Sequence, residues 1–175
     1  MTKVGFIGLG TMGASFATNL IKAGFDLTVH DINRGSAESH LAAGATWADS
    51  PKALAEVSDV VLTSLPGPAE IEAVALDETN GLIAGMAAGA AFFDLSTTSP
   101  TSIRHVHAVM AEKGLHVLDA PVSGGPAGAA SGKLAIWVGG DEAVFDKYRD
   151  VLNAMGDQAR YIGPIGAGSI AKLVH

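Results

Sequence analysis

A glycine-rich segment between a short apolar run and a helical pattern constrains the fold of this chain most. Residues 3–7 are predicted to form a buried strand, and residues 11–23 carry apolar side chains at helical spacing. Between them the chain reads Gly8-Leu9-Gly10-Thr11-Met12-Gly13. In such a strand–loop–helix unit, the first glycine allows a tight turn, the second lets a pyrophosphate approach the backbone, and the third lets helix and strand pack closely. Because the helix N-terminus favours an anion, the sequence predicts a dinucleotide-binding loop.

The rest of the chain continues to alternate between strands and helices. Strands are predicted at 27–30, 59–64, 90–95, 116–119, 134–138 and 160–162, and helices at 34–43, 99–113 and 141–155. This alternation predicts an α/β fold of the Rossmann type, with a doubly wound, mostly parallel sheet covered on both faces. We expect residues 1–163 to form this dinucleotide-binding domain. Residues 164–175 begin a helical pattern that is cut off, so we expect them to lead into a further domain.

Asp31 ends the second predicted strand, at a position suited to bind a cofactor. A carboxylate there accepts hydrogen bonds from the hydroxyls of an adenosine ribose. The same charge repels the 2′-phosphate of NADP, so we expect NAD. NADP remains possible because Arg34 is close enough in the sequence to pair with that phosphate. A glycine turn with an unrelated surface aspartate explains the order of strand, loop, helix and acid less well. A Walker loop is a poorer match, because Leu134 follows Gly132-Lys133.

The composition argues against several other classes of function. Eleven Lys and Arg against 18 Asp and Glu give a net charge of −7, so nucleic acid is not an expected partner. The chain has no cysteine and its histidines lack metal-ligand spacing, so no metal site is predicted. The uncharged segments 4–21 and 79–93 are too polar or too short to span a membrane, and we expect a cytoplasmic protein. Only 17% of the residues are charged, which suggests that another domain or subunit covers part of the surface.

Four further motifs occupy the later part of the chain. They are Leu65-Pro66, the segment 94–97 (Asp-Leu-Ser-Thr), the segment 119–125 (Asp-Ala-Pro-Val-Ser-Gly-Gly), and the segment 166–172 (Gly-Ala-Gly-Ser-Ile-Ala-Lys). Three of them follow a predicted strand end, where open α/β sheets bind their ligands. Together with the glycine loop, they resemble the β-hydroxyacid dehydrogenase family, which includes 3-hydroxyisobutyrate dehydrogenase. The resemblance covers the whole chain, and segment 119–125 is its most specific element.

The resemblance implies cofactor-binding roles for two of these motifs. Leu65 and Pro66 match the loop that lies against the cofactor, and Ser96 and Thr97 match the turn beside the nicotinamide. Each motif also has a purely structural interpretation. Pro66 can serve only to end a strand, and Ser96 and Thr97 can form a hydroxyl–backbone turn before the next helix.

The other two motifs match the substrate-binding and catalytic parts of the family. Ser123, Gly124 and Gly125 match the segment whose hydroxyl and backbone N–H groups hold the substrate carboxylate, and Lys172 matches the catalytic lysine. The alternatives are an ordinary loop and a solvated surface lysine. The family also has an asparagine four residues after the lysine and an all-helical second domain. Neither falls within these residues, so we expect an incomplete catalytic site in this chain.

The resemblance implies an oxidoreductase with NAD, or NADP, as cofactor. It would transfer a hydride reversibly between a small 3-hydroxy acid and its semialdehyde, with Lys172 as acid/base, and would form a homo-oligomer at full length. Two alternatives stay open. One is an imine reductase on the same fold, which the lysine at position 172 disfavours. The other is a dinucleotide-binding module without turnover, acting as a sensor or interaction domain.

Overall fold

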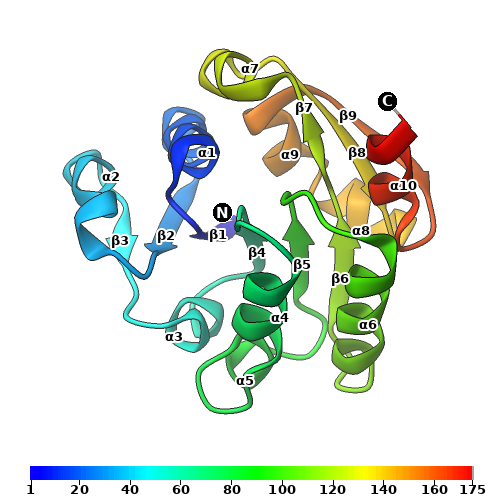
Figure 1. Cartoon of the computed structure of the whole chain (residues 1–175). Coiled ribbons are helices and arrows are strands. Elements are labelled where there is room, and N and C mark those ends of the chain that lie inside the picture. Colours follow the sequence, from blue (N-terminus) through cyan, green and yellow to red (C-terminus); the bar gives the residue numbers. More distant parts are fainter. Residues whose placement is uncertain (175) are drawn as a thin grey trace.

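A parallel sheet forms the centre of the structure, a computed structural model that describes residues 1–174, so that His175 lies outside the described residues (Figure 1). Its strands lie in the order β3-β2-β1-β4-β5-β6, all parallel to their neighbours. The bounds are Lys3–Ile7 (β1), Asp26–His30 (β2), Thr46–Trp47 (β3), Val60–Thr63 (β4), Ala91–Asp94 (β5) and His116–Asp119 (β6). This is the strand order of a Rossmann fold, and the predicted fold class is confirmed.

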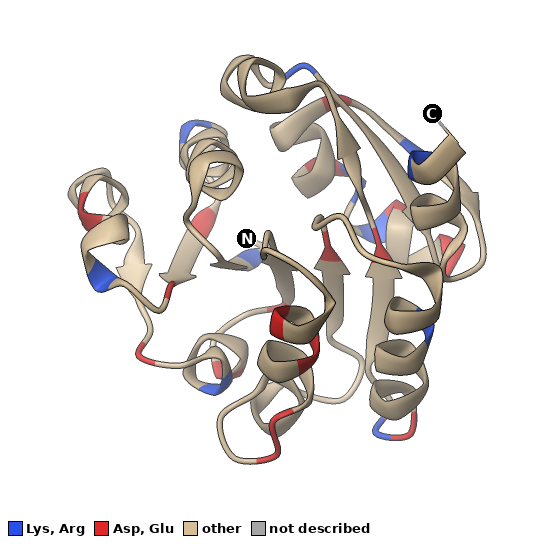
Figure 2. Ribbon diagram, viewed as in Figure 1, with Lys and Arg blue, Asp and Glu red and all other residues tan. Residues whose placement is uncertain are grey.

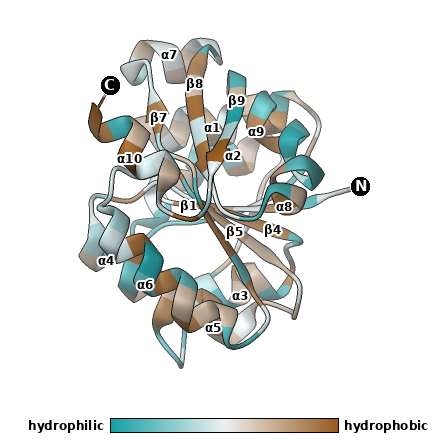
Figure 3. Cartoon of the chain, turned by 90° about the vertical axis from the view of Figure 1, so that its right-hand side faces the viewer, coloured by the Kyte–Doolittle hydropathy of each residue, from teal (hydrophilic) through white to brown (hydrophobic). Residues whose placement is uncertain are grey.

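Helices cover both faces of this sheet, because its strands carry apolar side chains on both sides. Phe93 belongs to the core on one face and its neighbour Phe92 to the core on the other, and both are fully buried. On the first face lie α1 (Thr11–Lys22), the 3₁₀ helix η1 (Arg34–Ala37), α2 (Glu38–Ala42), α7 (Gly125–Ser131), α8 (Glu142–Lys147) and α9 (Arg149–Met155). On the second lie α3 (Pro51–Glu56), α4 (Pro68–Leu76), α5 (Leu82–Gly85) and α6 (Pro100–Ala111). Figure 3 shows the apolar character of the central strand β5 between these layers.

The sheet continues beyond β6 with strands of mixed direction. β8 (Leu134–Gly139) meets β6 in antiparallel orientation at Asp119 and Gly139, and β7 (Val122–Ser123) also pairs antiparallel with β8. β9 (Gly156–Gly163) returns parallel to β8 and is longer than the predicted strand at 160–162. The mostly parallel sheet therefore has an extension in which β8 runs antiparallel to both β6 and β7.

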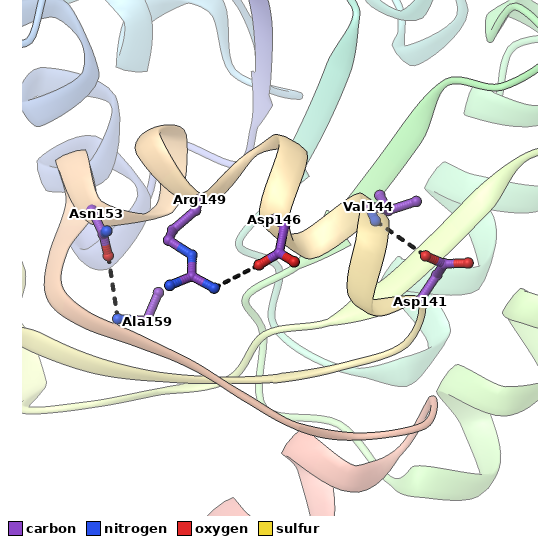
Figure 4. A network of polar contacts seen from close by, with 6 residues as sticks. All are labelled: Asp141, Val144, Asp146, Arg149, Asn153 and Ala159. Carbon is purple, nitrogen blue, oxygen red and sulfur yellow. Dashed lines mark hydrogen bonds and ion pairs between the residues drawn. The ribbon is translucent and has the colours of Figure 1, made fainter.

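The predicted helix at 141–155 is interrupted, which corrects the sequence interpretation. Asp141 caps α8 by accepting a hydrogen bond from the Val144 N–H at 3.1 Å, but the backbone leaves helical geometry at Tyr148 (φ −110°, ψ 15°). The Tyr148 ring is buried and lies edge-on to Phe93 at 6.2 Å, so its burial against the sheet outweighs helix continuity. An ion pair between Arg149 and Asp146 spans the break (Figure 4).

Several other elements differ from the sequence-based expectation. The helix predicted at 34–43 begins as the 3₁₀ turn η1, where the Asn33 side chain accepts from the Gly35 N–H. The prediction also missed β3, α3, α4, α5, β7 and α7. These elements are short, and the apolar faces that stabilise them are visible only after they pack on the sheet.

The final helix, α10 (Ala167–Val174), packs against β8, β9 and β6 at the end of the chain (Figure 1). Its side chains at Ile170, Leu173 and Val174 are exposed by 45%, 65% and 82%. The helical pattern seen in the sequence is therefore a helix docked on the sheet, with an apolar face left open.

Candidate functional site

The carboxyl ends of four parallel strands lie level with one another at one edge of the sheet. In register, Ile7 pairs with Thr63, Thr63 with Asp94, and Asp94 with Asp119, so β1, β4, β5 and β6 end together. Figure 2 shows acidic positions where β5 and β6 end. The loops that follow these strands carry all the predicted motifs except segment 166–172, which follows β9, so the fold brings most of the motifs to the edge where open α/β sheets bind ligands.

The loop after β1 has the geometry that its three glycines predict. Gly8 has a φ of +100°, and a Cβ on it would lie 2.1 Å from the Ser64 carbonyl oxygen, so a side chain does not fit. A Cβ on Gly13 would lie 1.7 Å from the Gly8 carbonyl oxygen, which means that helix and loop are in contact. Around Gly10 the space is open, and α1 has neither a side-chain cap nor an acidic residue in its first turn. Free N–H donors and room for an anion therefore coincide at this helix end.

A cavity of about 650 Å³ lies over this loop. Of the predicted cofactor-binding residues it is lined by Gly8, Gly10, Thr11, Met12, Gly13, Asp31, Leu65 and Pro66. Leu9 does not line it, because its side chain is buried in the core and its N–H donates to Asp31 Oδ2 at 2.7 Å. The Asn33 N–H donates to Asp31 Oδ1 at 2.9 Å. Two backbone donors therefore fix the Asp31 carboxylate beside the loop.

The charges around this cavity have one sign. Asp31, Glu70 and Asp77 line it, and no Lys or Arg is among the described residues that do. Backbone N–H groups of Asn80 and Thr79 hold the pKa of the Asp77 carboxyl below its usual value. Arg34, the sequence candidate for a second phosphate, instead has its guanidinium 5.1 Å from the centre of the Trp47 ring. The wall of the cavity therefore repels an additional phosphate group.

Part of the cavity wall was missed from the sequence. The missed residues lie mostly in α3, α4 and the loop after α4, and they are Ile7, His30, Ile32, Pro51, Ser64, Glu70, Ala73, Val74, Asp77 and Asn80. A signal for α3 was present, because Ser50 caps it and Pro51 follows as its first residue. The same Ser-Pro pattern predicted the helix that begins after Ser99.

A buried hydrogen-bond network joins the loops after β4 and β5. The Ser96 hydroxyl accepts from the Leu65 N–H at 2.8 Å, and the Ser96 N–H donates to Asp94 Oδ1 at 3.2 Å. Thr63 Oγ1 also donates to Asp94 Oδ1, at 2.8 Å, whereas Asp94 Oδ2 has no partner. Burial raises the pKa of the Asp94 carboxyl to about 6, against the hydrogen bonds from Ser96 and Thr63, and the nearby Asp119 adds to the rise. The network therefore fixes the position of the loop that carries Leu65 relative to the loop that carries Ser96.

A second cavity of about 270 Å³ brings the predicted catalytic lysine to these loops. Lys172 lines it together with Ser96, Thr97 and Gly125. Ser123 and Gly124 are adjacent in the chain but do not line it. The two cavities share the lining residues Met12, Ser64, Leu65 and Pro66, so they adjoin one another. An extended ligand can reach from Asp31 to Lys172 through them.

Other kinds of site receive no support from the described residues. Among residues 1–174, no cluster of three or more His, Cys, Asp or Glu could hold a metal ion. His30 Nδ1 lies 2.8 Å from the Ala48 carbonyl oxygen, and His40 Nε2 lies 2.9 Å from that of Ala14, so both have backbone partners. Within the same range, none of the helices has the length and apolar character needed to cross a bilayer.

Comparison with known proteins adds the decisive observation. The family model described as the NAD binding domain of 6-phosphogluconate dehydrogenase matches residues 3–163. The chain belongs to this family. Among its relatives is the NAD-dependent L-serine dehydrogenase of Pseudomonas aeruginosa, 46% identical over 99% of this chain and 58% of that protein. The 3-hydroxyisobutyrate dehydrogenase of the same organism is 40% identical with the same coverage.

Several solved structures have the same fold as this chain. Mycobacterium tuberculosis 3-hydroxyisobutyrate dehydrogenase with L-serine superposes with a TM-score of 0.91 at 39% identity, over 99% of this chain and 58% of that one. The chain therefore spans about 58% of the length of these relatives. An imine reductase from Myxococcus stipitatus has a TM-score of 0.90 at 22% identity, which shows a shared fold. The predicted resemblance to 3-hydroxyisobutyrate dehydrogenases is confirmed.

The loop fits the dinucleotide that the family binds. Its open space over Gly10 and uncapped helix N-terminus suit the pyrophosphate, and the fixed Asp31 carboxylate suits ribose hydroxyls. NAD is the cofactor of this family, and NADP occurs in similar structures, one of them a complex with NADP+ and 2-OPP.

Proposed function

We propose that this chain is the cofactor-binding part of an NAD-dependent dehydrogenase for small 3-hydroxy acids. The observation that carries the proposal is the adjoining pair of cavities, which links the glycine loop and Asp31 to Lys172. When bound at this loop, NAD would supply the hydride acceptor for oxidation of the alcohol carbon, and NADH the donor for the reverse reaction. The residues of this chain then have to bind the cofactor, orient the substrate and move one proton.

Each predicted site residue has a place in this proposal. The loop from Gly8 to Gly13 holds the pyrophosphate, and Asp31 accepts from the adenosine ribose. Leu65 and Pro66 support the middle of the cofactor, and Ser96 and Thr97 lie beside its nicotinamide. Lys172 Nζ takes the hydroxyl proton as the carbonyl forms and returns it in the reverse direction. Ser123, Gly124 and Gly125 hold the substrate carboxylate, which is supported by Gly125 in the same cavity as Lys172.

The relatives support the class of substrate. L-serine, 3-hydroxyisobutyrate and 2-(hydroxymethyl)glutarate, named for three of them, share a primary alcohol on the carbon next to the one that carries a carboxylate. A lysine suited to alcohol chemistry argues for this reaction over imine reduction. A binding module without turnover is the remaining alternative, and it predicts cofactor binding but no turnover in a version with the full length of the relatives.

The assembly and location of the protein are part of the same proposal. We place the boundary of the dinucleotide-binding domain at residue 163 and assign residues 164–175 to the helix that leads into a second, all-helical domain. The exposed apolar side chains of α10 support a covering domain or subunit there, and we propose a homo-oligomer at full length. The uncharged stretch from Val4 to Ile21 forms β1 and α1, which supports a cytoplasmic location.

The experiment that tests the proposal is steady-state turnover in a version with the full length of the relatives. L-serine and 3-hydroxyisobutyrate are oxidised with NAD, and Lys172→Ala is compared with the unchanged protein. We expect turnover to fall by about 10²- to 10⁴-fold with NADH binding retained. Full activity in Lys172→Ala would contradict the catalytic assignment, and absence of turnover in the unchanged protein would favour the binding module.

A further inference from the structure

The helix that carries Lys172 begins at a residue that cannot cap it. The Gly166 carbonyl accepts the hydrogen bond from the Ile170 N–H at 3.0 Å, so Gly166 is the residue that precedes the first turn of α10. Its φ is +92°, and a Cβ there would lie 2.7 Å from Arg104 Nε. A serine or aspartate, the usual capping residues, therefore does not fit at position 166.

Asp119 supplies the missing cap from a neighbouring strand. It is the last residue of β6 and has no exposed surface. Its Oδ1 accepts from the Gly166 N–H at 2.9 Å, and its Oδ2 accepts from the Ser169 N–H at 2.7 Å. Ser169 is the third residue of α10, whose N–H an N-cap side chain would normally bind. A carboxylate at this end is also favoured by the helix dipole.

Two glycines let α10 approach this carboxylate. Gly139 of β8 pairs with Asp119, and a Cβ on it would lie 2.5 Å from Asp119 Oδ1 and 3.0 Å from the Ala167 N atom. A Cβ on Gly168 would lie 2.4 Å from the Trp137 carbonyl oxygen. The helix start is therefore in direct contact with the sheet, and the position of its first turn is set by the strand ends.

Lys172 lies three residues after Ser169, so the anchored turn and the lysine are about 4.5 Å apart along the helix axis. We propose that Asp119 is a positioning residue that places Lys172 in the smaller cavity by holding the N-terminus of α10. This inference rests on the proposed function insofar as Lys172 is the acid/base. The alternative is that Asp119 stabilises the fold in general without determining where the lysine stands.

The first test measures amide hydrogen exchange of this chain by mass spectrometry, with Asp119→Asn compared with the unchanged protein. The variant keeps the size of the side chain but removes its charge and one of its two acceptors. Because a hydrogen bond to a charged group stabilises the helix start, we expect its loss to make amide exchange in α10 at least about tenfold faster. Asp141→Asn is the matched control, because Asp141 accepts one backbone hydrogen bond at the start of a different helix, α8 (Figure 4). We expect it to leave exchange in α10 unchanged.

The second test measures turnover in the full-length version. If Asp119 positions the lysine, Asp119→Asn lowers kcat by at least about tenfold while the KM for NAD stays within about twofold. Unchanged protection of α10, or unchanged kcat, would overturn the inference. So would an equal loss of NAD affinity, which indicates general destabilisation. If Asp119→Asn does not fold, Gly168→Ala takes its place, because the added Cβ pushes the start of α10 away from the sheet. This variant must also lower kcat while the KM for NAD stays within about twofold.

Lys172→Ala distinguishes a failure of this inference from a failure of the proposed function. If Lys172→Ala retains full turnover, the proposed function is wrong, and the exchange measurement alone decides whether Asp119 anchors α10. If Lys172→Ala is inactive while Asp119→Asn keeps its kcat, the result supports Lys172 as the acid/base, and the positioning role of Asp119 is wrong.

Discussion

The buried carboxyl of Asp94 predicts a pH dependence of stability that can be worked out from the structure. Its pKa in the folded protein is about 6, against the reference value of 3.8, so the folded state holds the proton more strongly than the unfolded state does. The stabilisation from this proton is fully present below pH 3.8 and is lost as pH rises through 6. A difference of about two pKa units corresponds to about 3 kcal/mol, of which roughly half is lost between pH 5 and 7.5.

The assay is urea unfolding of this chain and of Asp94→Asn at several pH values from 5 to 7.5. Asparagine keeps an oxygen that can accept from Thr63 and Ser96 but does not titrate. Relative to the unchanged chain, Asp94→Asn should therefore gain about 1 to 1.5 kcal/mol in unfolding free energy between the two ends of this range. A difference between the two proteins that stays constant with pH, or that changes in the opposite direction, would refute the reasoning.

Three further predictions concern the cofactor loop and the core. Asp31→Ala should weaken NADH binding by about tenfold and reduce the preference over NADPH, measured by fluorescence titration, because it removes the charge that repels a 2′-phosphate; a larger preference for NADH would contradict this. Gly13→Ala should abolish NADH binding at micromolar concentrations, since its Cβ would lie 1.7 Å from the Gly8 carbonyl oxygen, and unchanged affinity would show that the loop is not constrained there. Phe92→Ala should cost about 3 to 5 kcal/mol of unfolding free energy in urea, whereas the fully exposed Ile32 should tolerate alanine within about 0.5 kcal/mol.

The parts of the fold with strong local signals could be predicted from the sequence. The run from Lys3 to Ile7, the glycines at 8, 10 and 13, and the Ser99-Pro100 start each determine their own local geometry, and the structure agrees with them. The strand end at Asp119 was also placed correctly and that at Asp94 to within one residue, and the parallel sheet then brings the two level.

What could not be predicted depends on contacts between segments far apart in the chain. The break at Tyr148 follows from packing of its ring on Phe93, which no local pattern indicates. The bond from the Leu9 N–H to Asp31 and the contact of Arg34 with Trp47 likewise require the folded loop. For the same reason, Asp119 was noticed as part of a motif, but its two bonds to the start of α10 were not foreseen.

The central claim, that the adjoining cavities form an NAD site, is tested most directly by titrating this chain with NADH and NADPH in parallel. Binding is followed by fluorescence transfer from Trp47 and Trp137 to the reduced nicotinamide. We predict saturable binding of one NADH per chain, with NADPH at least about tenfold weaker because of the carboxylates of Asp31, Glu70 and Asp77. No saturable NADH signal, or tighter binding of NADPH, would contradict the account.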